Sequence, residues 1–237
     1  MGESAKAAVV IFARDPSGRV KTRLIPHLGV SGAQEFHCAC LQATARLAAS
    51  LPHAVDKFLY LTSSNRAEAR RAARGLRVPR GLCIRVQGGD HLGARLARMF
   101  AALWSEGYER VAVIGSDSPT LPRRRLLEAL AALRRRDAVL GPARDGGYYL
   151  IGLRRTLKKT KALFRGVEWG TPRAFTQTRR NLLAASLRVR VLPVGYDVDT
   201  PADLRRLARE VKRSGLKRLA PLRRWFGKKE KAKSLRG

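Results

Sequence analysis

The sequence predicts an α/β fold: a mostly parallel β-sheet with helices on both faces. Short apolar runs alternate along the chain with amphipathic stretches of about ten to twenty residues, a pattern typical of βαβ units. The runs AAVVIFA at residues 7–13 and VAVI at residues 111–114 are apolar throughout, as expected of strands buried on both faces. A length of 237 residues allows one large domain or two small ones.

Periodicity and local signals place the elements in order. Strands are predicted over residues 7–13, 58–62, 82–86, 110–114, 138–140, 148–153 and 189–194. Helices are predicted over residues 31–50, 65–74, 92–104, 122–134, 171–184 and 200–212. Residues 158–168 are expected to form a basic loop. Ser31 is expected to cap the first helix, and Thr200 with Asp203 resembles a capping box. We expect one domain over residues 1–211 and a basic C-terminal tail over 212–237.

The charge is strongly positive, with 49 Lys and Arg against 18 Asp and Glu. Phosphates, anionic lipids and nucleic acids are partners that suit such a surplus, and compositional bias explains it equally well. Residues 212–237 carry eleven cations against Glu230 alone, and apolar residues recur among them at three-residue intervals: Leu216, Leu219, Leu222 and Trp225. That amphipathic pattern suits a membrane surface, although a solvated tail has the same composition.

The localisation is predicted from segments that the sequence lacks. It contains no run of about 18 apolar residues, no signal-peptide pattern and, with three cysteines, no disulfide framework. We expect a cytoplasmic protein, with peripheral membrane contact through the basic tail as a further possibility.

The loops after the predicted strands carry the candidate chemistry, because ligands bind at the carboxyl ends of strands in open α/β sheets. The first loop, residues 14–23, contains four cations and Gly18, and it suits an anion. It is not a P-loop, since Lys21 stands three residues after the glycine. A plain surface loop is the alternative. Residues 87–95, beginning QGGD, would let a ligand approach the backbone; Asp90 as a helix cap is the alternative.

Carboxylates follow the later strands. Asp117 stands at the tip of a buried strand, where it suits Mg²⁺ or Mn²⁺ or else a helix cap. Asp145 opens a DGG turn before two tyrosines, which suits a sugar or a plain hairpin. Asp197 and Asp199 lie two apart in an extended segment, so only one of them can readily face a given metal.

Five segments in this order resemble an uncharacterised bacterial glycosyltransferase-like family: PSGRVKTRL, GSDSPTL, LGPARDGGYYLIGL, FRGVEW and DVDTPADL. Some members are described as arsenosugar-biosynthesis glycosyltransferases. The family is similar in turn to the GT-A nucleotide-diphospho-sugar transferases and to the molybdenum-cofactor and phospholactate guanylyltransferases. The resemblance covers roughly residues 9–207, and it implies a GT-A, Rossmann-like fold.

The resemblance also implies the residues of a site. Those expected at the nucleotide are Ala13, Arg14, Gly18, Lys21, Arg23, Gln87, Gly88, Arg95 and Ser116. The metal, Mg²⁺ or Mn²⁺, would be held by Asp117 with Asp199 or Asp197. Those expected at the sugar or acceptor are Asp145, Gly146, Gly147, Tyr148 and Trp169. Lys21, Asp117 and Asp145 are the expected catalytic residues. The chain departs from the family pattern at QGGDHLGARL, at Gly170 and in lacking a strict DxD.

Three functions fit these features. The first is a metal-dependent transferase that uses a nucleotide-diphospho-sugar, with an anionic acceptor suggested by the basic surface. The second is a nucleotidyltransferase that joins an NTP to a phosphorylated substrate. The third is a basic protein that binds nucleic acid or membranes, which the charge supports and for which the sequence has no specific nucleic-acid motif. Cys38, Cys40 and Cys83 form no metal-ligand spacing and are expected to be core thiols, and the four histidines have no spacing typical of a zinc site. Contact of His91 with a ligand is left open.

Overall fold

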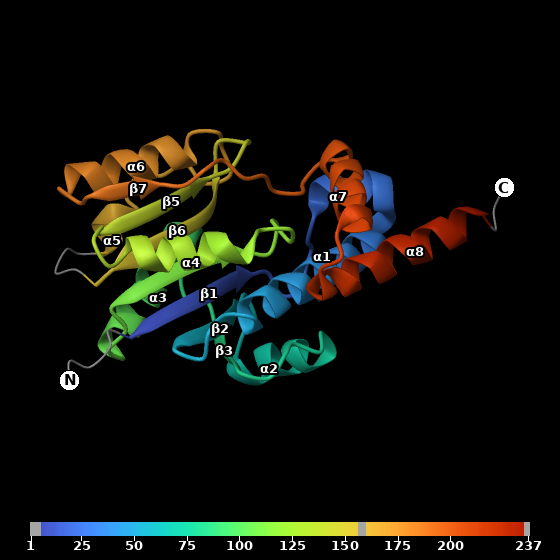
Figure 1. The fold of residues 1–237 in the computed structure, drawn as a ribbon, viewed down its shortest axis with the longest axis horizontal. Coiled ribbons are helices and arrows are strands. Elements are labelled where there is room, and N and C mark those ends of the chain that lie inside the picture. Colours follow the sequence, from blue (N-terminus) through green and yellow to red (C-terminus); the bar gives the residue numbers. More distant parts are fainter. Residues whose placement is uncertain (1–5, 156–159, 235–237) are drawn as a thin grey trace.

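The computed structural model describes residues 6–155 and 160–234. Its centre is a seven-stranded sheet in the order β3-β2-β1-β4-β6-β5-β7 (Figure 1). The strands are β1 (Ala7–Ala13), β2 (Val55–Leu61), β3 (Leu82–Val86), β4 (Arg110–Gly115), β5 (Ala138–Pro142), β6 (Tyr148–Arg154) and β7 (Val189–Val191). Only β6 runs antiparallel to its neighbours, β4 and β5. The predicted mostly parallel sheet is confirmed.

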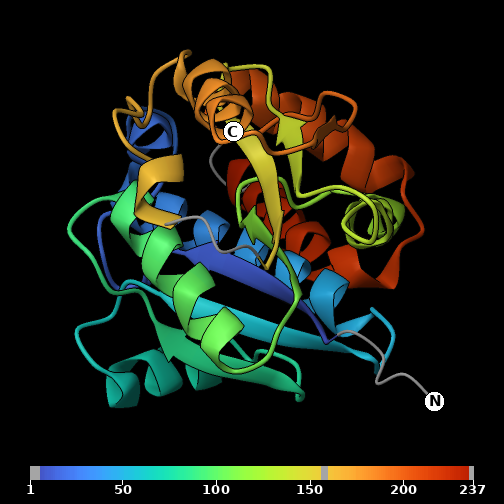
Figure 2. The same ribbon diagram turned by 90° about the vertical axis from the view of Figure 1, so that its left-hand side faces the viewer.

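Helices cover both faces of the sheet, as predicted (Figure 2). One face packs against α1 (Ile25–Ala49), α2 (Arg66–Gly75) and α4 (Arg123–Ala132). The other packs against α3 (Leu92–Ser105), α5 (Thr160–Leu163) and α6 (Ala174–Ala184). The side chains of β1 alternate between the two cores, since Val9 and Ile11 join the first and Val10 and Phe12 the second.

A third apolar cluster joins α1 to the C-terminal helices. It is built by α1, α7 (Pro201–Arg213), the short 3₁₀ helix η2 (Lys217–Leu219) and α8 (Ala220–Ser234). Leu219, Leu222 and Trp225 are buried in it, and the Trp225 and Phe36 rings lie 4.9 Å apart. Three of the four residues that carried the amphipathic pattern are therefore buried in this cluster, whereas the fourth, Leu216, is 52% exposed.

Several other expectations differ from the structure, and three of these differences change an element or its cap. The first helix begins at Ile25, not Ser31, and bends at Gly29, which has φ 71°. His91, rather than Asp90, caps α3 through its ring nitrogen. The expected loop at 158–168 contains α5, with Leu163 and Phe164 buried against the sheet; residues 156–159 lie outside the described part.

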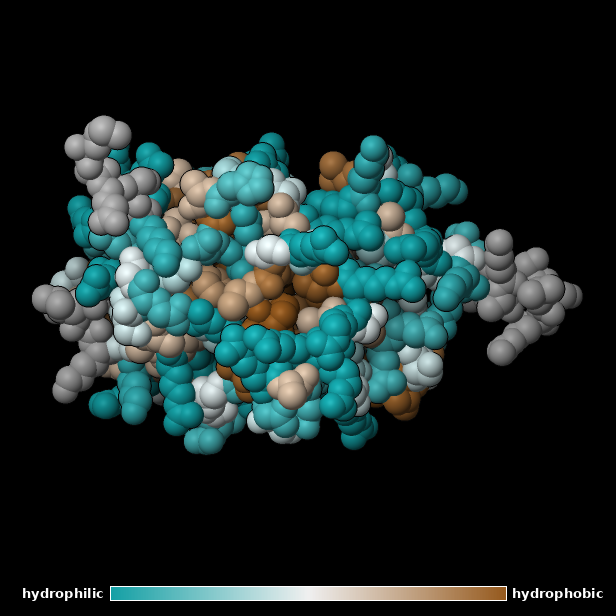
Figure 3. All heavy atoms as spheres, turned by 90° about the horizontal axis from the view of Figure 1, so that it is seen from below, coloured by the Kyte–Doolittle hydropathy of each residue, from teal (hydrophilic) through white to brown (hydrophobic). Residues whose placement is uncertain are grey.

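The order in which strands are added to the sheet reverses beside β1. The chain passes from β1 outward through β2 and β3 and then returns to β4 on the other side of β1, and such a switch point opens a crevice at the carboxyl ends of the strands. The surface seen in Figure 3 is dominated by hydrophilic side chains, with apolar ones gathered near its centre. Within the described residues, no helix is both long and apolar enough to span a membrane.

Candidate functional site

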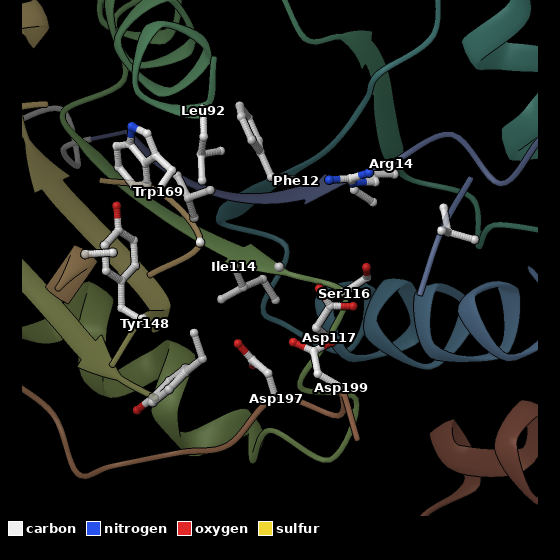
Figure 4. A pocket seen from close by; sticks show the side chains of 18 of the residues that line it. Phe12, Arg14, Leu92, Ile114, Ser116, Asp117, Tyr148, Trp169, Asp197 and Asp199 are labelled. Carbon is white, nitrogen blue, oxygen red and sulfur yellow. The ribbon is translucent and has the colours of Figure 1, made fainter. Parts of the chain in front are cut away.

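A cavity of about 630 Å³ lies at the carboxyl ends of β1 and β4, as the switch point predicts. Figure 4 shows its two ends. Ser116, Asp117, Asp197 and Asp199 gather at one end, and Leu92, Tyr148 and Trp169 stand at the other. A volume of this size is typical of small-molecule sites.

Lys21 is buried beneath the acidic end, with 3% of its side chain exposed. Its ammonium lies 2.5 Å from Asp117 Oδ1 and 3.2 Å from Asp199 Oδ1, and it donates a 2.7 Å hydrogen bond to the carbonyl of Val198. These contacts match the three donors of an ammonium group. Lys21 also has a left-handed backbone (φ 48°), a conformation that the surrounding contacts must hold in place.

The contact between Lys21 and Asp117 favours the charged forms of both groups. Burial alone would lower the pKa of Lys21, but the neighbouring Asp117 and Asp199 outweigh it and raise that pKa above its usual value. Burial likewise opposes ionisation of Asp117, and Lys21 outweighs it and lowers the pKa of this carboxyl. The result is a fixed cation between two carboxylates.

Both carboxylates remain open to the cavity. The Asp117 side chain is 44% exposed and that of Asp199 34% exposed, and Lys21 is within hydrogen-bonding distance of only one oxygen of each. The second oxygen of Asp199 lies 4.0 Å from the Arg23 guanidinium. The acidic end thus presents carboxylate oxygens to a ligand while Lys21 neutralises them from behind.

Asp197 lines the same cavity as Asp199, although the two-residue spacing predicted opposite directions, and it has a different partner. It accepts a hydrogen bond from the hydroxyl of Ser118 and makes no ion pair with Lys21. Burial, reinforced by Asp117 and Asp145, raises its pKa to about 7. This carboxyl is therefore partly protonated near neutral pH.

The donor set suits a hard divalent cation. In the described part of the chain, no group of three His, Cys, Asp or Glu side chains is placed to hold a metal ion. Asp117 and Asp199 could supply one oxygen each, and phosphate oxygens and water would complete the shell, as is usual for Mg²⁺.

Most residues expected at a nucleotide line the cavity: Ala13, Arg14, Lys21, Arg23, Gln87, Arg95 and Ser116. Gln87 donates both amide hydrogens to backbone carbonyls, of Ala13 at 2.9 Å and Tyr60 at 3.0 Å, and so ties β3 across β2 to β1. Gly18 instead lines a separate cavity of about 260 Å³ on the other side of the first loop. Gly88 lies outside both cavities.

Five residues were expected at a sugar or acceptor, and four of them lie at the cavity. Asp145, Gly147, Tyr148 and Trp169 line the cavity. The Asp145 carboxylate accepts a hydrogen bond from the Gly147 amide at 3.0 Å. Gly146 does not line the cavity. Its φ of 84° and the Pro172 carbonyl, 2.2 Å from where a Cβ would be, require glycine there.

The cavity also contains residues that sequence reasoning missed. The apolar side chains of Phe12 and Leu92 form part of its wall, and both residues lie in or next to predicted site segments. His37 is buried, and its Nε2 lies 3.1 Å from the Arg14 carbonyl, beneath the first loop. Burial lowers its pKa. Its place on a predicted helix gave no sign of that contact, because only the fold brings α1 under the loop.

Comparisons with known proteins agree on the fold. A search of curated proteins finds no significant match. A crystal structure from Desulfovibrio desulfuricans G20, of a protein named as a candidate nucleotide-diphospho-sugar transferase, is 31% identical. It matches with a TM-score of 0.81 over 93% of this chain and 95% of that chain.

More distant structures share the architecture. CMP:2-keto-3-deoxy-manno-octonic acid synthetase, solved with CTP, matches with a TM-score of 0.57 at 15% identity over 88% of this chain and 99% of that one. The 4-diphosphocytidyl-2C-methyl-D-erythritol synthase of Anaerococcus prevotii DSM 20548 matches with a TM-score of 0.55 at 14% identity, covering 88% and 97% of the two chains. The expected Rossmann-like fold of nucleotide-diphospho-sugar transferases is confirmed.

The family model that matches residues 43–171 is that of the uncharacterised proteins conserved in bacteria called DUF2064. This match spans more than half of the chain, and it agrees with the family expected from the five sequence segments. The chain is a member of the DUF2064 family.

Proposed function

We propose that this chain is a metal-dependent transferase that uses a nucleotide-diphospho-sugar as donor. The observation that carries the proposal is the pair of cavity-facing carboxylates, Asp117 and Asp199, held on the buried ammonium of Lys21. Arg14, Arg23 and Arg95 supply positive charge in the same cavity. The name of the D. desulfuricans relative supports the same class of donor.

The two ends of the cavity suit the two parts of such a donor. The cations and carboxylates would hold the diphosphate, with Mg²⁺ or Mn²⁺ neutralising its charge when bound. Gln87 lies on the β3 side of that end and fits the nucleoside. Asp145, Tyr148 and Trp169 lie on the β6 side, where an aromatic face and a carboxylate suit a sugar and its acceptor.

The proposed reaction is a substitution at the anomeric carbon. A hydroxyl oxygen of the acceptor forms a bond to that carbon, and the bond from the carbon to the diphosphate oxygen breaks. Its electron pair leaves with the nucleoside diphosphate, whose added charge Arg14 and Arg23 would stabilise. Asp145 is exposed and has one oxygen bonded to the Gly147 amide, so its other oxygen is free to take the acceptor proton.

Nucleotidyl transfer is the second candidate. The cavity is lined by three arginines besides Lys21, enough charge for a triphosphate. In that reaction a phosphate of the second substrate attacks the α-phosphorus of an NTP and pyrophosphate leaves. Release of a nucleoside diphosphate, rather than pyrophosphate, supports the glycosyl form.

Thermal denaturation in the presence of nucleotides tests the proposal. NDP-sugars and NTPs would be screened with and without Mn²⁺ on the wild type, on Asp117→Asn and on Asp137→Asn. Asp137 is a matched control because its carboxylate pairs with Arg154 and Arg188, away from the cavity. At 100 times its Kd, a donor should raise the Tm of the wild type and of Asp137→Asn by about 5–10 °C.

The outcomes separate the candidates. A shift with an NDP-sugar that disappears without metal and in Asp117→Asn supports the first function. A shift with an NTP alone supports nucleotidyl transfer. No shift with any nucleotide would overturn both.

A further inference from the structure

The loop that carries Asp117, residues 116–121, is held by later parts of the chain. The Val198 amide donates to the Asp117 carbonyl at 2.9 Å, and the Ser118 hydroxyl donates to the Tyr196 carbonyl at 3.0 Å. Thr120 donates to a carboxylate oxygen of Glu210 on α7 at 2.9 Å. The position of Asp117 therefore depends on segments that follow it by about 80 residues or more.

Arg218 holds the far side of the same loop. From η2, its two terminal nitrogens donate to the carbonyls of Pro119 at 2.6 Å and Leu121 at 2.9 Å. Among the described residues Arg218 makes no ion pair within 4.0 Å, so these carbonyls are its partners. A planar guanidinium fork can bridge two acceptors in a fixed geometry, which an ammonium group cannot do.

The segment that carries Arg218 is itself anchored beneath the site. Leu219, Leu222 and Trp225 are buried, and Trp225 packs on Phe36 of α1. The Phe36 ring lies in turn 6.0 Å from the Lys21 ammonium. One apolar cluster thus supports both the loop that carries Asp117 and the lysine that holds its carboxylate.

We propose that Arg218 is a positioning residue, which fixes the 116–121 loop so that the Asp117 carboxylate is held beside Asp199 at the cavity. The inference rests on the proposed function in assigning Asp117 to the metal and the diphosphate. Its structural part, the ordering of the loop by Arg218, can be measured without any ligand.

Arg223 provides a matched control. Its two terminal nitrogens also donate to backbone carbonyls, of Ser214 at 2.9 Å and Leu216 at 3.0 Å. It lies in the same C-terminal segment and has the same kind of hydrogen bonds, but its acceptors are outside the Asp117 loop. Loss of either arginine should lower the Tm by a similar amount.

The experiment compares the wild type with Arg218→Gln, Arg218→Lys and Arg223→Gln as full-length chains. Binding of Mn²⁺ alone would be measured by the EPR signal of the free ion, and amide hydrogen exchange in residues 116–121 by mass spectrometry. Arg218→Gln should bind Mn²⁺ about tenfold more weakly, the size of effect known for groups that orient metal ligands, and should exchange the loop amides faster. Arg218→Lys should resemble Arg218→Gln because the charge without the fork does not hold both carbonyls.

Arg223→Gln should keep wild-type Mn²⁺ binding and loop exchange. Equal effects of the Arg218 and Arg223 variants on binding and exchange would overturn the proposal, as would unchanged exchange in Arg218→Gln. If the wild type binds no Mn²⁺, the metal part of the proposed function fails, and loop exchange alone decides the role of Arg218. If Arg218→Gln does not fold, Arg218→Lys is judged by the same comparison.

Discussion

The contacts of Lys21 could not be predicted from residue types alone. A lysine in a cationic loop after the first strand predicted contact with phosphate, and Asp117 at a strand tip predicted a metal ligand. The structure brings these two residues together, at 2.5 Å, and adds Asp199 from a segment almost 180 residues later in the chain. The partners of a buried lysine depend on contacts between distant segments of the chain. The loop sequence alone could therefore not predict that the Lys21 ammonium contacts carboxylates.

The raised pKa of Asp197 predicts how the free energy of unfolding depends on pH. Its folded-state pKa of about 7 lies above the ordinary value of 3.8, so between these values the folded protein binds more protons than the unfolded chain. This carboxyl therefore lowers the free energy of unfolding as pH rises from about 4 to about 7. Replacing it with Asn removes that loss, and Asp197→Asn should gain stability relative to wild type at pH 8 but much less at pH 5.

Urea unfolding of both proteins at the two pH values measures the difference. The extra gain at pH 8 should be on the order of 1 kcal/mol, after allowance for solvent screening. Asp90→Asn, which removes an exposed carboxylate beyond β3, controls for the loss of one negative charge. A gain of the same size at pH 5 and pH 8 would show that Asp197 does not titrate as stated.

At the scale of elements, the glycines around β5 and β6 position an aromatic wall of the cavity. Tyr149 on β6 lies between Gly141 and Gly195, where added Cβ atoms would come within 2.4 and 2.6 Å of its ring. Its hydroxyl donates to the Pro193 carbonyl at 3.0 Å. The segment from Pro193 to Gly195 leads directly to Asp197, so the fit of this ring helps to place the acidic end.

Gly195→Ala should therefore be destabilising. The new methyl group must displace the Tyr149 ring, and overpacking of this kind costs about 1–3 kcal/mol. Gly215→Ala is the control, because a Cβ there meets no atom within 4 Å, and its effect should be within about 0.5 kcal/mol of zero. Chemical denaturation of the two variants measures both values. Equal stabilities of the two variants would contradict the close fit of Tyr149.

Element boundaries were predicted best where the signals were local. The predicted strands at 82–86 and 110–114 and the capping box at Thr200 agree closely with the structure. The prediction missed only the first helical turn, residues 25–28, which the non-helical backbone of Gly29 separates from the helix predicted from Ser31. Pro221 interrupts the three-residue apolar spacing near the C-terminus without breaking a helix. Proline suits the first turn of a helix, where no backbone donor is lost, and this one lies at the second residue of α8.

At the scale of the whole molecule, the site is assembled from the full length of the chain. The matched family region, residues 43–171, contains Asp117 and Asp145 but neither Lys21 nor Asp199. The sequence placed these four residues in one site through the resemblance and through the rule that strand ends meet at one edge. The sequence could not predict that His37 and Arg218 contact the loops of the site. These contacts depend on how α1 and the C-terminal helices pack together.

The packing of the C-terminal helices also limits how the basic segment can bind a membrane. Of the four apolar residues expected to face a membrane, Leu219, Leu222 and Trp225 are buried against α1 and α7, and only Leu216 is exposed. Exposed cations such as Lys217, Arg224 and Lys228 remain on this part of the surface. We therefore expect any attraction to an anionic membrane to be mainly electrostatic, with little insertion of apolar side chains.

Sedimentation with lipid vesicles tests this conclusion. With a net charge of +31, the protein should bind phosphatidylserine-containing vesicles at low ionic strength and leave them at about 0.5 M salt, because exposed charges are then screened. Vesicles of neutral phosphatidylcholine, the matched control, should not bind it at either salt concentration. Binding to anionic vesicles that persists in high salt, or any binding to neutral ones, would contradict a mainly electrostatic attraction. If that binding comes from opening of α8, the Asp117 loop that Arg218 holds from the same segment should also loosen, and amide exchange in residues 116–121 should rise in the presence of vesicles.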